Sequence, residues 1–212
     1  MFYEPLKRLM DILLATILGI LFLPLCLLTA LAIKLESPGP ILADTPSRVG
    51  RKGKLFKLYK FRSMIAGAHG LLRRDPRFRR LYQEYKKSSY KLREDPRVTR
   101  VGRLIRKHSI DEIPQLINVL KGEMSIVGPR PYYPDELGEQ QERYPHTQKL
   151  VEEVLSVRPG ITGAWQVSGR SEVNFDKRIV MDAEYVRRKS LLYDIMVILK
   201  SPWAMISGKG AV

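Results

Sequence analysis

Cysteine is almost absent from the sequence, which has one residue of this type, Cys26, among 212. A single cysteine cannot form a disulfide framework within the chain, so disulfide-rich secreted folds are excluded and a reducing compartment is favoured. Because Cys26 lies in the most apolar stretch, we expect it to pack as a small hydrophobic residue without a functional role. The sequence also lacks the Gly-x-Ser-x-Gly turn of serine hydrolases, which disfavours hydrolases of the serine and cysteine types.

Acidic residues are scarce relative to basic ones. There are 22 Asp and Glu against 37 Lys and Arg, and the formal net charge is +15. This excess predicts an anionic partner: a nucleic acid, an anionic lipid surface or a phosphorylated substrate. Because helix-turn-helix spacing, zinc-ligand patterns and aromatic RNA-binding motifs are missing, we do not expect nucleic-acid binding. Most basic residues between positions 48 and 107 are interpreted as contacts with anionic membrane lipids.

Charge is missing altogether between Ile12 and Ile33. As a helix, this run would be about 33 Å long, close to the hydrocarbon thickness of a bilayer. It is longer than the apolar region of a typical signal peptide, and no small-residue cleavage site follows it. We therefore favour a membrane helix over a cleaved leader.

Pro24 lies near the middle of this apolar run, where it removes a backbone donor and breaks or kinks the helix. Basic residues flank the run on both sides, with Lys7 and Arg8 before it and Lys34 and Arg48 among those after it. The positive-inside rule places such residues on the cytoplasmic side, and both ends qualify. We therefore favour a re-entrant helix, broken at Pro24, that enters and leaves by the cytoplasmic face. A kinked span is the alternative, because spanning helices also tolerate proline.

The remaining sequence predicts a mainly α fold with a small β element, an α+β domain. Glycine-rich turns and alternating apolar residues place the β element within 48–62. Helical spacing of apolar residues predicts helices at 71–93 with a break at Asp75-Pro76, 97–106, 113–120 and 174–188. The apolar run 191–199 is too short to span a membrane. It could lie in the membrane interface or pack in the core, and we expect the core. The expected organisation is a membrane helix and flank at 1–36 and one interfacial catalytic domain at 37–212.

Asp111 and Glu112 form an acidic pair before the helix expected at 113–120. Helix capping alone would explain them, because Ser109 and Glu112 have capping-box spacing and Asp111 is a common N-cap residue. However, basic residues precede the pair and a Gly-Pro-Arg-Pro segment follows the helix. Positive side chains and free backbone N–H groups would keep a carboxylate ionised and attract a phosphate. The spacing thus also fits aspartyl-phosphate chemistry, with Glu112 as a ligand for Mg²⁺.

Five segments carry a resemblance that covers nearly the whole chain. They are Lys60–Met64, Asp95–Gly102, Lys107–Pro131, Arg158–Gly163 and Gly169-Arg170. In this order they resemble the signature of the bacterial sugar transferase family, the monotopic phosphoglycosyl transferases. The resemblance implies a re-entrant helix broken by proline and a place in the bacterial inner (cytoplasmic) membrane, with the catalytic domain on the cytoplasmic face.

The resemblance also implies a reaction. Asp111 resembles the family's nucleophile, which attacks a UDP-sugar, releases UMP and holds the sugar phosphate covalently until polyprenyl (undecaprenyl) phosphate attacks it. Glu112 resembles the second member of the acidic pair, associated with Mg²⁺. The side chains that match phosphate-contacting positions are Lys60, Arg62, Arg106 and Arg130. For Lys60 and Arg106, contact with lipid headgroups is the alternative. Such a reaction is the first membrane step of a bacterial polysaccharide or glycoconjugate pathway.

The sequence departs from the family pattern near the membrane helix. Leu23 precedes Pro24 where some members have a serine, whose hydroxyl can bond the freed backbone. The segment 41–46 is also less apolar and aromatic than we expect. The ending 206–212 resembles members that act on UDP-hexoses, which favours a hexose-1-phosphate. A basic membrane-tethered scaffold without catalysis is the alternative function, and the oligomeric state stays open, with a homodimer as one option.

Overall fold

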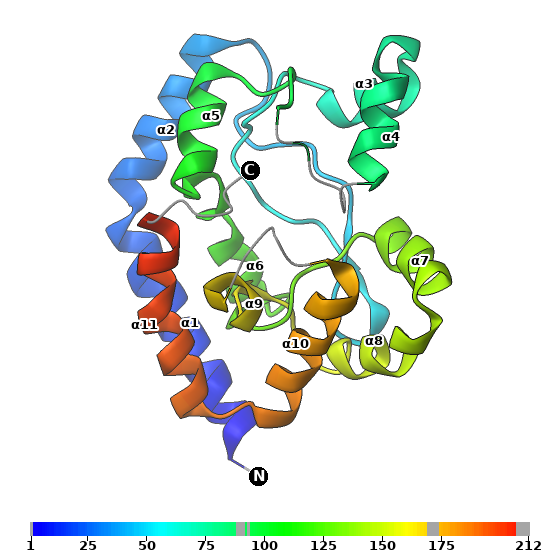
Figure 1. The fold of residues 1–212 in the computed structure, drawn as a ribbon. Coiled ribbons are helices and arrows are strands. Elements are labelled where there is room, and N and C mark those ends of the chain that lie inside the picture. The colour runs from blue at the N-terminus through cyan, green and yellow to red at the C-terminus, as the bar shows by residue number, and fades with distance from the viewer. Residues whose placement is uncertain (1, 88–91, 93, 169–173, 207–212) are drawn as a thin grey trace.

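The computed structural model describes residues 2–87, 92, 94–168 and 174–206. The helices are α1 (Tyr3–Leu21), α2 (Leu23–Glu36), α3 (Ala68–Arg74), α4 (Arg79–Lys87), α5 (Arg100–Lys107), α6 (Gln115–Lys121), α7 (Pro134–Arg143), α8 (Gln148–Val154), α9 (Ala164–Ser168), α10 (Phe175–Arg188) and α11 (Leu191–Ile206). The strands are β1 (Arg48–Val49), β2 (Leu55–Phe56), β3 (Ser125–Val127) and β4 (Gly160–Thr162). In Figure 1, α1, α2 and α11 form one side of the molecule, and α3, α4, α7 and α8 lie on the opposite side. The prediction of a mainly α fold with a small β element is confirmed.

The predicted β element is a short hairpin. β1 pairs antiparallel with β2, so that Arg48 lies opposite Phe56. Lys52 and Gly53 form the turn between the strands with φ angles of 57° and 75°, a conformation that glycine adopts without a steric penalty. The chain after β2 contributes two further bridges, Met64 with Val98 and Phe61 with Leu42. The latter bridge places the segment that follows the hairpin beside the exit from α2.

A second, parallel pair of strands was not predicted. Ser125 of β3 aligns with Gly160 of β4, and Val127 aligns with Thr162. The two backbones are in close contact, because a Cβ at Gly160 would lie 2.1 Å from the nitrogen of Gly128. The pairing therefore brings the Gly-Pro-Arg-Pro segment next to the segment of residues 158–163, two parts of the family signature that are distant in sequence.

Most predicted helices are present. The region 71–93 contains two helices, α3 and α4, separated by a 3₁₀ turn in which Asp75 accepts the backbone N–H of Arg77. The prediction at 113–120 is met by α6, which ends at Gly122 with a φ of 79°. The prediction at 174–188 is met by α10. The structure does not describe residues 88–91 and 93, the matched pair Gly169-Arg170, or the ending beyond residue 206.

Helix α11 is buried on one face only. Val197 and Asp194 are fully buried, whereas the exposed fractions of Leu192, Leu199 and Trp203 are 78%, 73% and 79%. The buried face belongs to the core that also contains residues of α1, α6 and β3. The expectation that 191–199 packs in the core is therefore right for one face and wrong for the other.

Helices α1 and α2 form a pair bent by 59°. Pro24 lies in the first turn of α2, so the break predicted there is confirmed. Among the described residues, no single helix has the length and apolar character needed to cross a membrane, but the bent pair taken together has both. The pair exposes large apolar side chains along its length, namely Leu9, Leu13, Ile17, Ile20, Leu21, Leu23, Leu27, Leu28, Leu31 and Leu35.

Lys7 contacts the protein rather than the solvent. It is 7% exposed, and its Nζ lies 3.1 Å from Oδ1 of Asp11 and 3.2 Å from Oδ2 of Asp194. Arg8 donates to two backbone carbonyls at the C-terminus of α6, at 2.6 and 3.0 Å. The sequence did not predict these contacts of Lys7 and Arg8, and the placement of both ends of the pair on the cytoplasmic side stays a prediction.

Both arms of the bent pair rest on the same body. α1 packs against α6, β3 and α11. The end of α2 packs against α5, where Ile33, Phe61 and Ile105 form a small core. Cys26 packs against this core as an apolar residue, as predicted. The bend thus leaves an apolar outer face between two anchored ends.

Candidate active site

The segment 58–62 positions the lysine of the candidate site. It runs between the exit from α2 and a 3₁₀ turn at Ile110–Glu112. The backbone N–H of Ala43 donates to the carbonyl of Lys60, and that of Phe61 donates to the carbonyl of Asp111, both at 2.9 Å. Because Phe61 is also packed between α2 and α5, the same segment joins the bent pair to the acidic turn.

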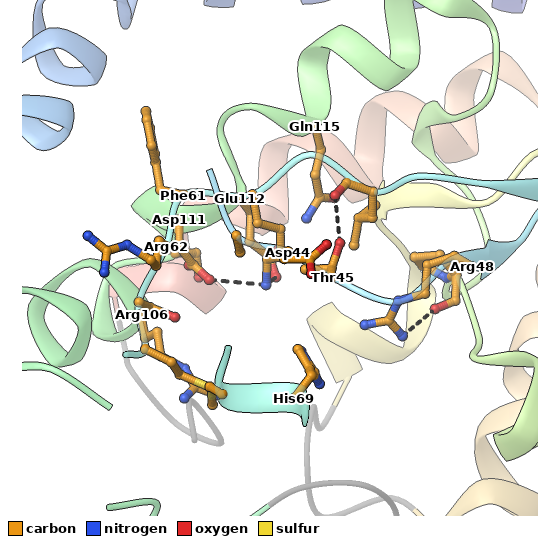
Figure 2. A pocket seen from close by; sticks show the side chains of 18 of the residues that line it. Asp44, Thr45, Arg48, Phe61, Arg62, His69, Arg106, Asp111, Glu112 and Gln115 are labelled. Atoms are coloured by element: carbon orange, nitrogen blue, oxygen red, sulfur yellow. Dashed lines mark hydrogen bonds and ion pairs between the residues drawn. The ribbon is translucent and has the colours of Figure 1, made fainter. Parts of the chain in front are cut away.

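Lys60 contacts both carboxylates of the acidic pair. Its Nζ lies 3.0 Å from Oδ2 of Asp111 and 3.0 Å from Oε1 of Glu112. The side chain of Asp111 is 7% exposed and that of Glu112 is 33% exposed. Figure 2 shows the pair at one end of a pocket, with the ion pair to Asp111 drawn as a dashed line. Asp111 is therefore a nearly buried carboxylate held by a single ammonium group that it shares with Glu112.

Helix capping does not explain the acidic pair. Ser109 makes no side-chain cap, and the residues 110–112 form a separate 3₁₀ turn before α6. The residue that precedes α6 is Pro114, which also provides no side-chain cap. In addition, Ser109 has a φ of 54°, a conformation that costs a residue with a side chain free energy and that clusters at functional sites. The acidic pair therefore requires another explanation.

Burial raises the pKa of Asp111, and the neighbouring Glu112 carboxylate acts in the same direction, while Lys60 opposes both. For Lys60, burial alone would lower the pKa, but the Asp111 and Glu112 carboxylates raise it above its ordinary value. The sequence argument that nearby cations keep Asp111 ionised considered only its partners, and burial is the larger effect. The ammonium of Lys60 is thus the main group that favours the ionised form of Asp111.

The acidic pair faces a cavity of about 490 Å³. All of the predicted catalytic and phosphate-contacting residues line it, namely Lys60, Arg62, Arg106, Asp111, Glu112 and Arg130. Side chains from the hairpin, α3, α5, the 3₁₀ turn and the Gly-Pro-Arg-Pro segment therefore meet in one place. The phosphate-contacting roles of these residues stay predictions.

Two of these arginines also have structural contacts. The Nη atoms of Arg62 donate to the carbonyls of Ser37 and Pro38 at 2.8 and 2.9 Å, where the chain leaves α2. The guanidinium of Arg130 lies 5.6 Å from the ring centre of Trp165. Arg62 thus ties the cavity to the end of the bent helix pair, and Arg130 is held at the cavity wall by an aromatic ring.

Three further residues at or beside the cavity were not singled out from the sequence. Arg48 and His69 line it. Asp182 of α10 lies behind it, where its Oδ2 accepts the backbone N–H of Arg130 at 3.2 Å and the hydroxyl of Tyr132 at 3.0 Å. In the sequence, Arg48 is one of many basic residues and Asp182 lies on an amphipathic helix. Neither pattern distinguishes Arg48 or Asp182 from residues outside the cavity.

The site fits Mg²⁺ only with the help of a substrate. Among the described residues, no group of three or more His, Cys, Asp or Glu side chains could hold a metal ion. Asp111 and Glu112 provide two adjacent carboxylates at the cavity, and Mg²⁺ is commonly held by one or two carboxylates together with substrate phosphates. Lys60 contacts both carboxylates, so a metal ion bound there would compete with its ammonium.

Comparison with known proteins supports the resemblance found in the sequence. Residues 2–208 match the family described as bacterial sugar transferase. The chain is 43% identical to the undecaprenyl-phosphate galactose phosphotransferase of Salmonella typhimurium and 40% identical to the UDP-galactose-lipid carrier transferase of Erwinia amylovora, with 97% of the chain and 41% of each relative covered. It is 40% identical to the exopolysaccharide production protein ExoY of Sinorhizobium fredii, with 97% of the chain and 87% of the relative covered.

The chain thus spans about two fifths of the length of the first two relatives and most of the third. The match to the family extends over all of the described residues, including both arms of the bent pair and every residue of the acidic turn. This chain belongs to the bacterial sugar transferase family.

Proposed function

We propose that this chain transfers a sugar-1-phosphate, a hexose-1-phosphate, from a UDP-sugar to polyprenyl (undecaprenyl) phosphate and releases UMP. The names of the Salmonella and Erwinia relatives support the two substrates, and that of the Sinorhizobium relative supports a role in exopolysaccharide production. The observation that carries the proposal is the nearly buried carboxylate of Asp111, which faces the cavity and pairs with Lys60.

In the proposed first step, Asp111 is the nucleophile. An oxygen of its ionised carboxylate bonds to the phosphorus that carries the sugar, and the bond between this phosphorus and the oxygen of the UMP group breaks. UMP leaves with the electron pair, and an aspartyl-phosphosugar remains. In the second step, an oxygen of polyprenyl phosphate attacks the same phosphorus and the Asp111 carboxylate is restored. Lys60 orients the carboxylate and neutralises charge, which is most of what phosphoryl transfer requires of a protein.

We assign the binding of Mg²⁺ to Glu112, together with phosphate oxygens of the donor. When bound, the ion supplies neutralisation of the charge on the diphosphate. Arg106 and Arg130 line the same cavity and contribute positive charge to it. In this proposal Glu112 holds the metal and Asp111 performs the attack.

We further propose that the bent pair enters and leaves the cytoplasmic face of the membrane as a re-entrant helix, in the bacterial inner membrane. Its two ends are anchored on the same body, α1 on α6, β3 and α11, and α2 on α5. Its outer face is apolar and exposed. This packing supports re-entry. In the proposed arrangement, the cavity lies near the membrane surface, where a lipid phosphate is found.

The test is UMP release from a panel of UDP-sugars by the purified chain with Mg²⁺ and polyprenyl phosphate. Asp111→Asn is expected to abolish UMP release and the lipid-linked product. Asp135→Asn, which alters a partly exposed carboxylate paired with Arg73, serves as the control and is expected to retain both. If Asp111→Asn keeps full activity, the nucleophile is wrong. If no UDP-sugar reacts while the chain still binds anionic membranes, the scaffold function is favoured instead.

A further inference from the structure

Arg48 is a buried arginine at the end of the cavity opposite Asp111 (Figure 2). It is 8% exposed, its guanidinium carbon lies 3.2 Å from the ring centre of Tyr133, and its Nη1 donates to the carbonyl of Pro131 at 3.1 Å. Its Nε has no hydrogen-bond partner among the residues that the structure describes. A buried donor without a partner costs free energy, so its presence beside a cavity points to an acceptor that enters from the cavity.

The surroundings of Arg48 contain further positive charge, which the buried carboxylate of Glu136 partly offsets. Arg130 lines the same cavity, and its Nε also lacks a hydrogen-bond partner within the described residues. Burial and the nearby charges of Arg97 and Arg48 together lower the pKa of His69 to about 4. His69 is therefore neutral at physiological pH and does not add to this charge, while the arginines remain cationic. An anion such as a phosphate would lower the electrostatic free energy of this region.

The two ends of the cavity lie at different distances from the bent pair α1 and α2. Arg62 holds backbone carbonyls at the exit from α2, and Arg106 belongs to α5, which packs against α2. Figure 2 shows both arginines on the side of Asp111 and Arg48 on the far side. A lipid phosphate that arrives along α2 therefore reaches Asp111 from the Arg62 and Arg106 end. The Arg48 end remains for the other phosphate of the reaction, that of the nucleotide.

We propose that Arg48 binds the phosphate of the departing nucleoside monophosphate, an inference that rests on the proposed function. When the carboxylate of Asp111 bonds to the sugar phosphorus, the bond to the nucleotide oxygen breaks and its electron pair stays on the nucleotide phosphate. That phosphate gains one negative charge during the step. Arg48 provides a buried cation at this end of the cavity, so its interaction is stronger in the transition state than with the bound donor.

The experiment measures direct binding of UMP and of uridine to the purified full-length chain in detergent by calorimetry. Arg48→Gln is expected to weaken UMP binding by about 10- to 100-fold, the effect of a lost hydrogen bond to a charged group, and uridine binding by less than about 3-fold. Arg48→Lys keeps the charge without the planar fork, and an intermediate loss is expected. Arg51→Gln is the matched control, because Arg51 lies next to the same hairpin but donates to the carbonyl of Ser156 outside the cavity.

Four outcomes are decisive. The inference is overturned if Arg48→Gln and Arg48→Lys bind UMP as tightly as the wild type, or if the wild type binds neither UMP nor UDP. It is also overturned if Arg48→Gln weakens binding of a short polyprenyl phosphate rather than of UMP, because the lipid phosphate would then occupy this end. If UMP binding depends on Arg48 but no UDP-sugar is turned over, the nucleotide site stands and the proposed transferase function fails.

Discussion

At the scale of single residues, Asp182 is a buried carboxyl group that supports the cavity wall from behind. Burial raises its pKa to about 7, although the N–H of Arg130 and the hydroxyl of Tyr132 donate to it. The pKa of an aspartate in the unfolded chain is about 3.9. Between these values the folded protein binds more protons than the unfolded chain, so the contribution of Asp182 to stability falls as the pH rises toward 7.

We therefore expect the free energy of unfolding of Asp182→Asn, relative to that of the wild type, to increase as the pH rises from 5 to 8. The difference is of the order of a few kcal/mol, because one pKa unit corresponds to about 1.4 kcal/mol. Chemical denaturation in detergent micelles at the two pH values measures it. His69→Asn is the control with the opposite sign, since the pKa of His69 is lowered to about 4 and its contribution grows as the pH rises. A pH-independent difference for Asp182→Asn would contradict the argument.

Lys60 is the residue on which the acidic pair depends. Its ammonium is the ion-pair partner of both carboxylates within the described part of the chain. We expect Lys60→Met to lower kcat/KM by about 100-fold or more, the usual effect of removing a charged group that stabilises a transition state. Lys60→Arg should lose less, because the charge remains. Lys57→Met alters an exposed lysine just before the segment 58–62 and should be neutral in the same UMP-release assay.

If Lys60→Met is as active as the control Lys57→Met, Asp111 does not need its ion pair with Lys60. Because the buried carboxylate would then have to ionise without a partner, the assignment of Asp111 as nucleophile would also have to be abandoned.

At the scale of elements, the helices could largely be predicted from the sequence and the long-range pairings could not. The helices α6 and α10 were predicted because apolar spacing and stop signals are local. The parallel pair β3 and β4 was missed because each strand has three residues, too few to show a periodic pattern. The ion pair of Lys7 with Asp194 was missed because Asp194 lies near the other end of the chain.

In the candidate site, too, local patterns could be predicted and long-range contacts could not. The acidic pair and four basic residues of the cavity were predicted, because they match positions of the family pattern. Arg48, His69 and Asp182 were not, because only the folded chain brings them to the cavity. The sequence also left open whether Asp111 is a helix cap. The structure excludes that explanation, because the acidic turn ends before α6 begins.

The docking of α1 on α11 rests on a buried polar cluster. Asp194 accepts hydrogen bonds from Tyr185 at 2.7 Å and Tyr3 at 3.0 Å and pairs with Lys7, while Asp11 accepts from Ser125 at 2.7 Å. Removing one partner of a buried ion pair typically costs about 3 to 5 kcal/mol, since the other charge is left uncompensated. α1 is therefore held in place by specific polar contacts in addition to apolar burial.

We expect Asp194→Ala to lower the free energy of unfolding in micelles by about 3 kcal/mol and to increase protease cleavage near the N-terminus. Glu4→Gln is the control, because Glu4 of α1 pairs at 2.9 Å with Lys189, which lies just before α11, in a more exposed position. Exposed pairs contribute about 0 to 1 kcal/mol. Equal losses for the two variants would mean that the buried cluster does not hold α1.

At the scale of the whole molecule, the bent pair and the cavity are parts of one arrangement. The end of α2 contacts Phe61, the neighbour of Lys60, and Arg62 binds the backbone at the same exit. A helix pair that left the membrane on the far side could not keep both ends on this body. The topology of the pair is therefore coupled to the geometry of the acidic site.

Cysteine labelling in intact cells tests this coupling, with Cys26→Ser as the background. Phe2→Cys places a thiol at a residue that is 79% exposed, at the start of α1. A re-entrant pair keeps this thiol on the cytoplasmic side, so a membrane-impermeant maleimide should leave it unlabelled until the cells are lysed. Lys54→Cys, an exposed position in the catalytic domain, is the matched control and should behave in the same way. Labelling of Phe2→Cys but not of Lys54→Cys from outside would require α1 to cross the membrane. That result is incompatible with the contacts that join α1 to β3 and α11, because those contacts hold both arms of the pair on the body that carries Asp111.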